Sequence, residues 1–131
     1  DLADELQKRA EKADWTADCL IEVNIGNELS KSGFSLENVY DAYQKLVKYP
    51  NIRIRGLMGM LPICEDTQHL RSLCLSMRKI YDTIKEQDEN ICYLSMGMSG
   101  DWKLCVECGS NMIRLGTSLF GPRKIQLPVN D

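Results

Sequence analysis

The sequence predicts one α/β domain in which helices cover a parallel sheet. Amphipathic helical stretches alternate with short apolar runs, and strands are expected to start near residues 19, 52, 91 and 112. Such alternation is typical of parallel strands joined by right-handed crossovers. Two architectures fit this order, a small open sheet or half of an eight-stranded (β/α) barrel. Periodicity alone does not choose between them.

Composition narrows the class of protein. The chain has 131 residues, of which 44% are hydrophobic and 27% charged, as in one ordinary globular domain. Its formal charge of -3 disfavours a nucleic-acid partner, because affinity for a phosphate backbone comes from clustered cations. We find no apolar run long enough for a membrane helix and no secretion signal. This favours a cytoplasmic protein, with the mitochondrion as the second candidate location. Because the chain begins with Asp1, we expect it to be a piece of something longer.

The first half of the chain contains two expected helices and two expected strands. Apolar residues recur at helical spacing over residues 2–13, and the mostly apolar run at 19–24 predicts a strand that leads into a polar loop. Ser35 can cap a helix over residues 36–48, which ends before Pro50. Alternation over residues 52–58 predicts the next strand.

The second half repeats the pattern with shorter elements. The longest amphipathic stretch, residues 67–87, predicts a helix, and residues 91–96 predict a strand. A short helix over 101–108 is expected to end at Gly109, and a fourth strand is expected over 112–115. Residues 124–131 are expected to form a C-terminal tail.

Two loops after the last strands have the composition of a phosphate site. Ser99 and Gly100 precede a short helix, and Gly116 and Thr117 follow the next strand. Backbone amides and hydroxyls in such loops bind anions, and paired loops of this kind form phosphate sites in (β/α) barrels. The alternative is structural, with Ser99 as a helix cap and Gly116 as a turn residue. Only the pairing of the two loops favours a ligand.

Arg114 lies in the otherwise apolar run MIRL. A guanidinium in such a strand is costly to bury without an acceptor. We therefore expect Arg114 either to face a polar ligand pocket or to form a structural ion pair.

The cysteines do not indicate a metal site. Cys105 and Cys108 form a CxxC pair, but the chain has a single histidine, His69, and no second CxxC to complete a zinc site. We expect these two thiols to pack toward the barrel and His69 to lie on the surface. Parallel strands place a ligand at their carboxyl ends, where the loops that follow the strands emerge, and we call this side of the sheet the ligand face. Lys31 is expected to be a solvated cation near the ligand face. Asn24 is expected either to bind a ligand or to satisfy the hydrogen bonds of its own loop.

Four segments together carry a specific resemblance. In chain order they are VNIGNELSKSGF, IRIRGLMGMLPICED, LSMGMSGDW and ECGSNMIRLGTSLFGPR. They resemble the pyridoxal phosphate homeostasis protein family, whose fold is related to the N-terminal domain of alanine racemase. The resemblance implies that residues 1–131 are a single partial domain. That domain would be the C-terminal half of a parallel (β/α) barrel, with about four strands of an eight-stranded barrel.

The resemblance also implies a site and a role. Ser99, Gly116 and Thr117 would hold the phosphate of pyridoxal 5'-phosphate, and Arg114 would approach the pyridine nitrogen. Met98, which follows a strand end, is expected either to pack in the barrel or to contact the cofactor ring. The lysine that forms the Schiff base would precede Asp1, which agrees with lysines that all fall outside the expected strands. A permanent cation beside the ring nitrogen disfavours its protonation and weakens the cofactor as an electron sink. The implied role is therefore vitamin B6 homeostasis without catalysis, with PLP-dependent apoenzymes as candidate partners.

Two other functions stay open at this stage. One is a fold type III PLP enzyme such as an amino-acid racemase, which needs an acid or base on each face of the cofactor. The five tyrosines lie outside the expected ligand-face loops, which disfavours that alternative. The other is an α/β domain whose glycine-rich loops bind a different phosphate ester.

Overall fold

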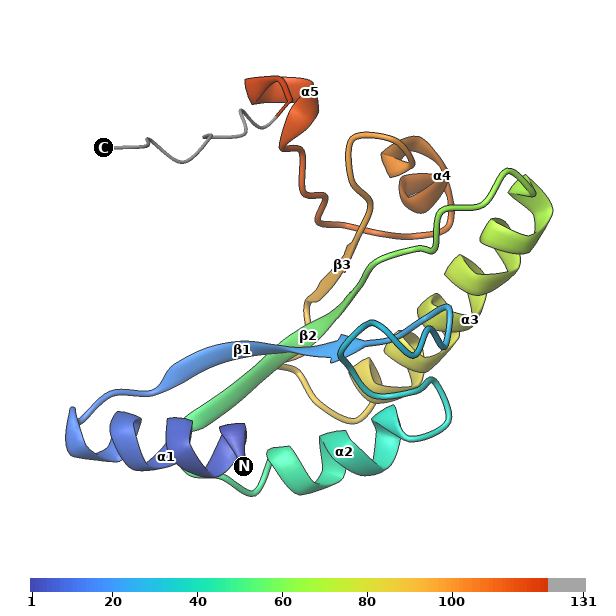
Figure 1. Cartoon of the computed structure of the whole chain (residues 1–131). Coiled ribbons are helices and arrows are strands. Elements are labelled where there is room, and N and C mark those ends of the chain that lie inside the picture. Colours follow the sequence, from blue (N-terminus) through green and yellow to red (C-terminus); the bar gives the residue numbers. More distant parts are fainter. Residues whose placement is uncertain (123–131) are drawn as a thin grey trace, which may run out of the picture.

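The computed structural model describes residues 1–122, so the expected tail at 124–131 lies outside the described residues. Three strands and five helices make up this part of the chain (Figure 1). In order they are α1 (Leu2–Lys12), β1 (Ala17–Val23), α2 (Val39–Leu46), β2 (Ile52–Gly59), α3 (Thr67–Lys85), β3 (Tyr93–Met96), α4 (Trp102–Glu107) and α5 (Thr117–Phe120).

The sheet is parallel, and its strands are neighbours in chain order, β1-β2-β3. β1 pairs with β2 from Ala17 opposite Ile52 to Val23 opposite Gly59. The shorter β3 pairs with the second half of β2, ending with Met96 opposite Gly59. The predicted parallel α/β class is confirmed, and strand order does not reverse within the described sheet.

The predicted fourth strand over 112–115 is wrong for the described residues. Met112 forms only an isolated parallel bridge with Ser95 of β3. Side chains supply much of the pairing there, because Asn111 Oδ1 accepts from Leu94 N at 2.7 Å and Asn111 Nδ2 donates to Cys92 O at 2.8 Å. A side chain that takes the place of backbone pairing interrupts the regular ladder that defines a strand.

The second helix is also shorter than predicted. It begins at Val39 rather than residue 36 and ends at Leu46. Ser35 Oγ does accept from a backbone amide, Asn38 N at 3.2 Å, as an N-cap would. The residues between them form a turn that precedes α2.

The core lies between the sheet and its helices. Figure 1 shows α1, α2 and α3 on one side of the strands, with α4 and α5 following β3. The fully buried members of the core come from all three strands and from α2, α3 and α4, and they include Val39, Leu57, Cys74, Met77, Tyr81, Ile84, Leu94, Met96 and Cys105. Gly56 permits close contact within the sheet, because a Cβ there would lie 1.8 Å from Tyr93 O.

Candidate functional site

The loop after β3 is held in a tight turn by its own residues. Met98 N donates to Asp101 Oδ1 at 2.8 Å, and Trp102 N donates to Met98 O at 3.0 Å. Ser99 and Gly100 occupy the middle of this turn, just before α4. Asp101 was not predicted as a site residue, although Asp is favoured in a turn where its side chain can accept a bond from a nearby backbone amide.

The structure brings this loop together with the loop at Gly116. Ser118 N donates to Ser99 Oγ at 2.9 Å, a contact that joins segments 19 residues apart. Between the two loops lies a cavity of about 510 Å³. Its lining residues are Met98, Ser99, Gly100, Gly116, Thr117, Phe120 and Gly121. Four of the five predicted site residues, Met98, Ser99, Gly116 and Thr117, therefore surround one cavity.

Two glycines that line the cavity, Gly100 and Gly116, are not required by the packing around them. A Cβ placed on Gly100 or on Gly116 would meet no atom within 4 Å, and neither residue has a positive φ. Neither packing nor backbone conformation therefore requires glycine at these positions. A bare backbone beside a cavity allows a ligand to approach the amide groups closely.

Arg114, the fifth predicted residue, does not line this cavity. It follows the Met112 bridge, and its backbone N donates to Gly97 O at 2.8 Å. Its guanidinium donates from Nε to Ser95 Oγ at 3.2 Å and from Nη2 to Gly59 O at 2.6 Å. Both acceptors are neutral and lie near the carboxyl ends of β2 and β3.

The remaining candidates on this face have structural roles. The side chain of Asn24 organises its own loop, donating to Glu28 O at 2.7 Å and accepting from Glu28 N at 3.0 Å. Lys31 is 3.3 Å from the Glu28 carboxylate, so it is paired rather than free. The contacts of Asn24 favour its structural alternative, whereas Lys31, expected to be a solvated cation, forms an ion pair and is only partly exposed. None of the eight lysines among residues 1–122 lies on a strand.

The CxxC pair packs between helices. Cys105 of α4 is buried, and its Sγ lies 3.9 Å from the Sγ of Cys74 on α3. The hydrogen bond with Cys105, together with burial, raises the pKa of the Cys74 thiol. Burial also raises the pKa of Cys108. These thiols contact α3 rather than the ligand face, and no cluster among the described residues has the groups to hold a metal ion.

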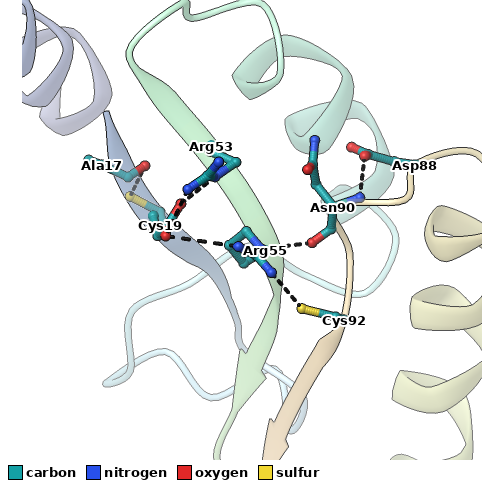
Figure 2. A network of polar contacts seen from close by, with 8 residues as sticks. Ala17, Cys19, Arg53, Arg55, Asp88, Asn90 and Cys92 are labelled. Atoms are coloured by element: carbon teal, nitrogen blue, oxygen red, sulfur yellow. Dashed lines mark hydrogen bonds and ion pairs between the residues drawn. The ribbon is translucent and has the colours of Figure 1, made fainter. Parts of the chain in front are cut away.

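A second polar cluster lies at the opposite end of the strands. Figure 2 shows Arg53 and Arg55 of β2 between β1 and the segment that leads into β3. Arg55 donates to Asn90 O at 3.0 Å and to Cys92 Sγ at 3.1 Å. The hydrogen bond from Arg53 holds the pKa of Asp18 below its ordinary value. This network joins β1, β2 and the segment before β3 at the end opposite the loops of Ser99 and Gly116, so we assign it to the scaffold.

The two groups that accept hydrogen bonds from Arg114, the Ser95 hydroxyl and the Gly59 carbonyl, were not predicted from the sequence. Ser95 had a usable signal, since it is a serine between the fully buried Leu94 and Met96. The Gly59 carbonyl had no such signal, because every residue carries a backbone carbonyl.

Within residues 1–122, no helix is both long and apolar enough to cross a membrane.

The chain is similar to several known proteins over most of its length. The pyridoxal phosphate homeostasis protein of Aquifex aeolicus (strain VF5) is 40% identical over 124 residues, covering 94% of this chain and 54% of that protein. The crystal structure of an unknown protein from Bifidobacterium adolescentis has a TM-score of 0.86 at 32% identity, covering 91% of this chain and 49% of that one. The structure of PipY from Synechococcus elongatus PCC7942 with PLP bound has a TM-score of 0.76 at 28% identity, covering 92% and 56%.

The chain thus spans about half the length of the relatives it matches. The family described as alanine racemase, N-terminal domain, matches residues 1–124. That match covers nearly all of the sequence, including both loops of the cavity. The chain belongs to the alanine racemase N-terminal domain family.

Proposed function

We propose that this chain forms the phosphate-binding side of a pyridoxal 5'-phosphate site, in a protein of vitamin B6 homeostasis. The observation that carries the proposal is the contact of two loops around one cavity, joined by the bond from Ser118 N to Ser99 Oγ at 2.9 Å. We infer the identity of the ligand from the names of the relatives. A pyridoxal phosphate homeostasis protein and PipY with PLP bound both match nearly the whole chain.

The residues present suit a phosphate. The Ser99 hydroxyl and the amides near Gly116 and Thr117 are neutral donors, and the backbone beside Gly100 and Gly116 is unobstructed. Met98 forms part of the same wall. Hydroxyls and amides at loops after parallel strands are a common phosphate site in this kind of fold.

Arg114 would serve the other end of the cofactor, beside the pyridine nitrogen. Bound pyridoxal phosphate supplies an electron sink for carbanions, and a cation at its ring nitrogen weakens that property. The proposal therefore describes a carrier whose partners include PLP-dependent apoenzymes, acting in the cytoplasm or in a mitochondrial pool.

The proposal extends to the architecture. The three consecutive parallel strands would be one side of a (β/α) barrel, so that residues 1–131 form a partial domain. The cofactor-binding lysine would lie in a segment outside this chain, since the described lysines are off the strands. Among the described residues, the outer edge of β1 is paired only near Val23, by an isolated bridge with Phe34, which leaves room for a further strand on that side.

The test uses the natural full-length protein and two ligands, pyridoxal phosphate and pyridoxal. We expect a visible absorbance band with pyridoxal phosphate that shifts after borohydride reduction. Ser99→Ala should weaken pyridoxal phosphate binding about tenfold and leave pyridoxal binding unchanged, because of the two ligands only pyridoxal phosphate has a phosphate that can accept from this hydroxyl. Ser76→Ala, an exposed serine on α3, is the control.

Three results would contradict the proposal. Absence of the absorbance band would exclude the cofactor, and copurification of a different phosphate ester would identify the other ligand class. Equal loss of both ligands in Ser99→Ala would remove the phosphate role of this loop. Robust turnover with several amino acids would establish the racemase alternative.

A further inference from the structure

Arg114 differs from the other arginines of this chain in its partners. Within residues 1–122, each other arginine has a carboxylate oxygen within 4 Å, the pairs being Arg9–Glu5, Arg53–Asp18, Arg55–Asp18, Arg71–Glu107 and Arg78–Asp82. Arg114 has no such pair there and is held by the Ser95 hydroxyl and the Gly59 carbonyl. Its positive charge is therefore not compensated by any described side chain.

Ser95 has little structural reason to be a serine. It is 1% exposed, lies on β3 opposite Met58 of β2, and has fully buried apolar neighbours on either side. Burial of a hydroxyl is unfavourable unless it is hydrogen-bonded. The one side-chain hydrogen bond recorded for Ser95 within residues 1–122 is the bond from Arg114 Nε at 3.2 Å.

The two acceptors fix the guanidinium in its plane. Ser95 Oγ takes the Nε hydrogen and Gly59 O takes one Nη2 hydrogen, from neighbouring strands. A guanidinium has five N–H groups in a rigid, planar arrangement, so two fixed bonds also set the direction of the others. The Nη1 group has no partner among the described residues.

We propose that Ser95 is a positioning residue, which orients the guanidinium of Arg114 so that its unpaired N–H groups face a ligand near the carboxyl ends of β2 and β3. The inference rests on the proposed function and adds a residue to it. Ser95 need not touch the cofactor itself. Its effect passes through Arg114.

A double-mutant cycle in the natural full-length protein separates this role from general stabilisation. The variants are Ser95→Ala, Arg114→Gln and the pair, with dissociation of pyridoxal phosphate and the pH dependence of its absorbance as readouts. We expect Ser95→Ala to weaken binding roughly tenfold and to shift the pH profile, because a charged hydrogen bond is lost. In the Arg114→Gln background the same change should have no further effect. Ser95→Thr, which keeps the oxygen, should restore the wild-type pH profile.

The outcomes distinguish failure of the proposed function from failure of the positioning role of Ser95. If the wild type shows no absorbance band, the proposed function fails. If the wild type binds but Ser95→Ala keeps its affinity and pH profile, or if the two substitutions are additive, the positioning role is overturned. Should Ser95→Ala not fold, exchange of the Arg114 Nε hydrogen in the wild type decides the question. Exchange as fast as that of free arginine in solution would overturn the role, and slow exchange would support it.

Discussion

Replacing Ser110 with alanine tests how much this hydroxyl stabilises the segment that lies beside β3 in place of a regular fourth strand. The side chain is 7% exposed, and its Oγ donates toward Leu94 O at 3.0 Å, Met96 O at 2.6 Å and Met112 O at 3.0 Å. It also accepts from Met96 N at 3.2 Å. Because a hydroxyl has a single proton, alanine removes one donated and one accepted bond. The donated bond is worth about 1 kcal/mol when buried, and the accepted bond is worth less, because Met96 N also donates to Met112 O at 3.1 Å. Ser110→Ala should therefore lower the unfolding free energy by about 1–2 kcal/mol.

Urea unfolding of the natural full-length protein, followed by circular dichroism, measures this effect. Ser76→Ala is the matched control, because Ser76 is exposed on α3 and, among residues 1–122, its Oγ bonds only to Ser72 O of the preceding turn. Alanine is the better helix former, so the control should be neutral or slightly stabilising. A loss below about 0.5 kcal/mol for Ser110→Ala, comparable to that of a surface substitution, would refute the structural role of this hydroxyl.

Three further predictions concern the core, the thiols and the isolated chain. Tyr81→Phe should leave the unfolding free energy unchanged or raise it, because the buried Tyr81 hydroxyl has no described partner. Tyr43→Phe should lower the unfolding free energy by about 1 kcal/mol, because its hydrogen bond to Asp88 is lost. Urea unfolding of the two variants measures the difference. A thiol reagent should modify the half-buried Cys64 before the buried Cys74, as peptide mapping would show. The isolated chain, incubated with pyridoxal phosphate and reduced with borohydride, should gain no mass, and a stoichiometric adduct on one lysine would contradict the proposed position of the reactive lysine.

The regular part of the fold could be predicted because its information is periodic. β2, with alternating buried and exposed residues at its start, and α3, with a continuous apolar stripe, were both recognisable from spacing. The paired loops at Ser99 and Gly116 were predictable for a related reason. Parallel strands place the loops that follow them at one end of the sheet, so two adjacent loops of the same chemistry converge.

The irregular part depends on particular side-chain contacts that periodicity does not contain. Residues 112–115 have the composition of a strand, yet Ser110 and Asn111 take part of the pairing that a strand would make with its backbone. The acceptors of Arg114 were hidden for another reason. One is a backbone carbonyl, at Gly59, and only the three-dimensional structure shows which carbonyl faces a given guanidinium.

The two ends of the proposed ligand meet different kinds of residue, and this difference has a consequence for binding. The cavity between the loops is lined by residues without charge, so a phosphate there would be held by neutral hydrogen bonds with strict geometry. Arg114 supplies charge without a described counterion, but it lies outside that lining. Neutral donors must offset the loss of phosphate hydration and of the ligand's rotational and translational freedom, which costs several kcal/mol. Covalent attachment to a lysine elsewhere in the protein would remove much of that entropic cost, and we therefore expect the loops described here to set specificity for the phosphate more than overall affinity.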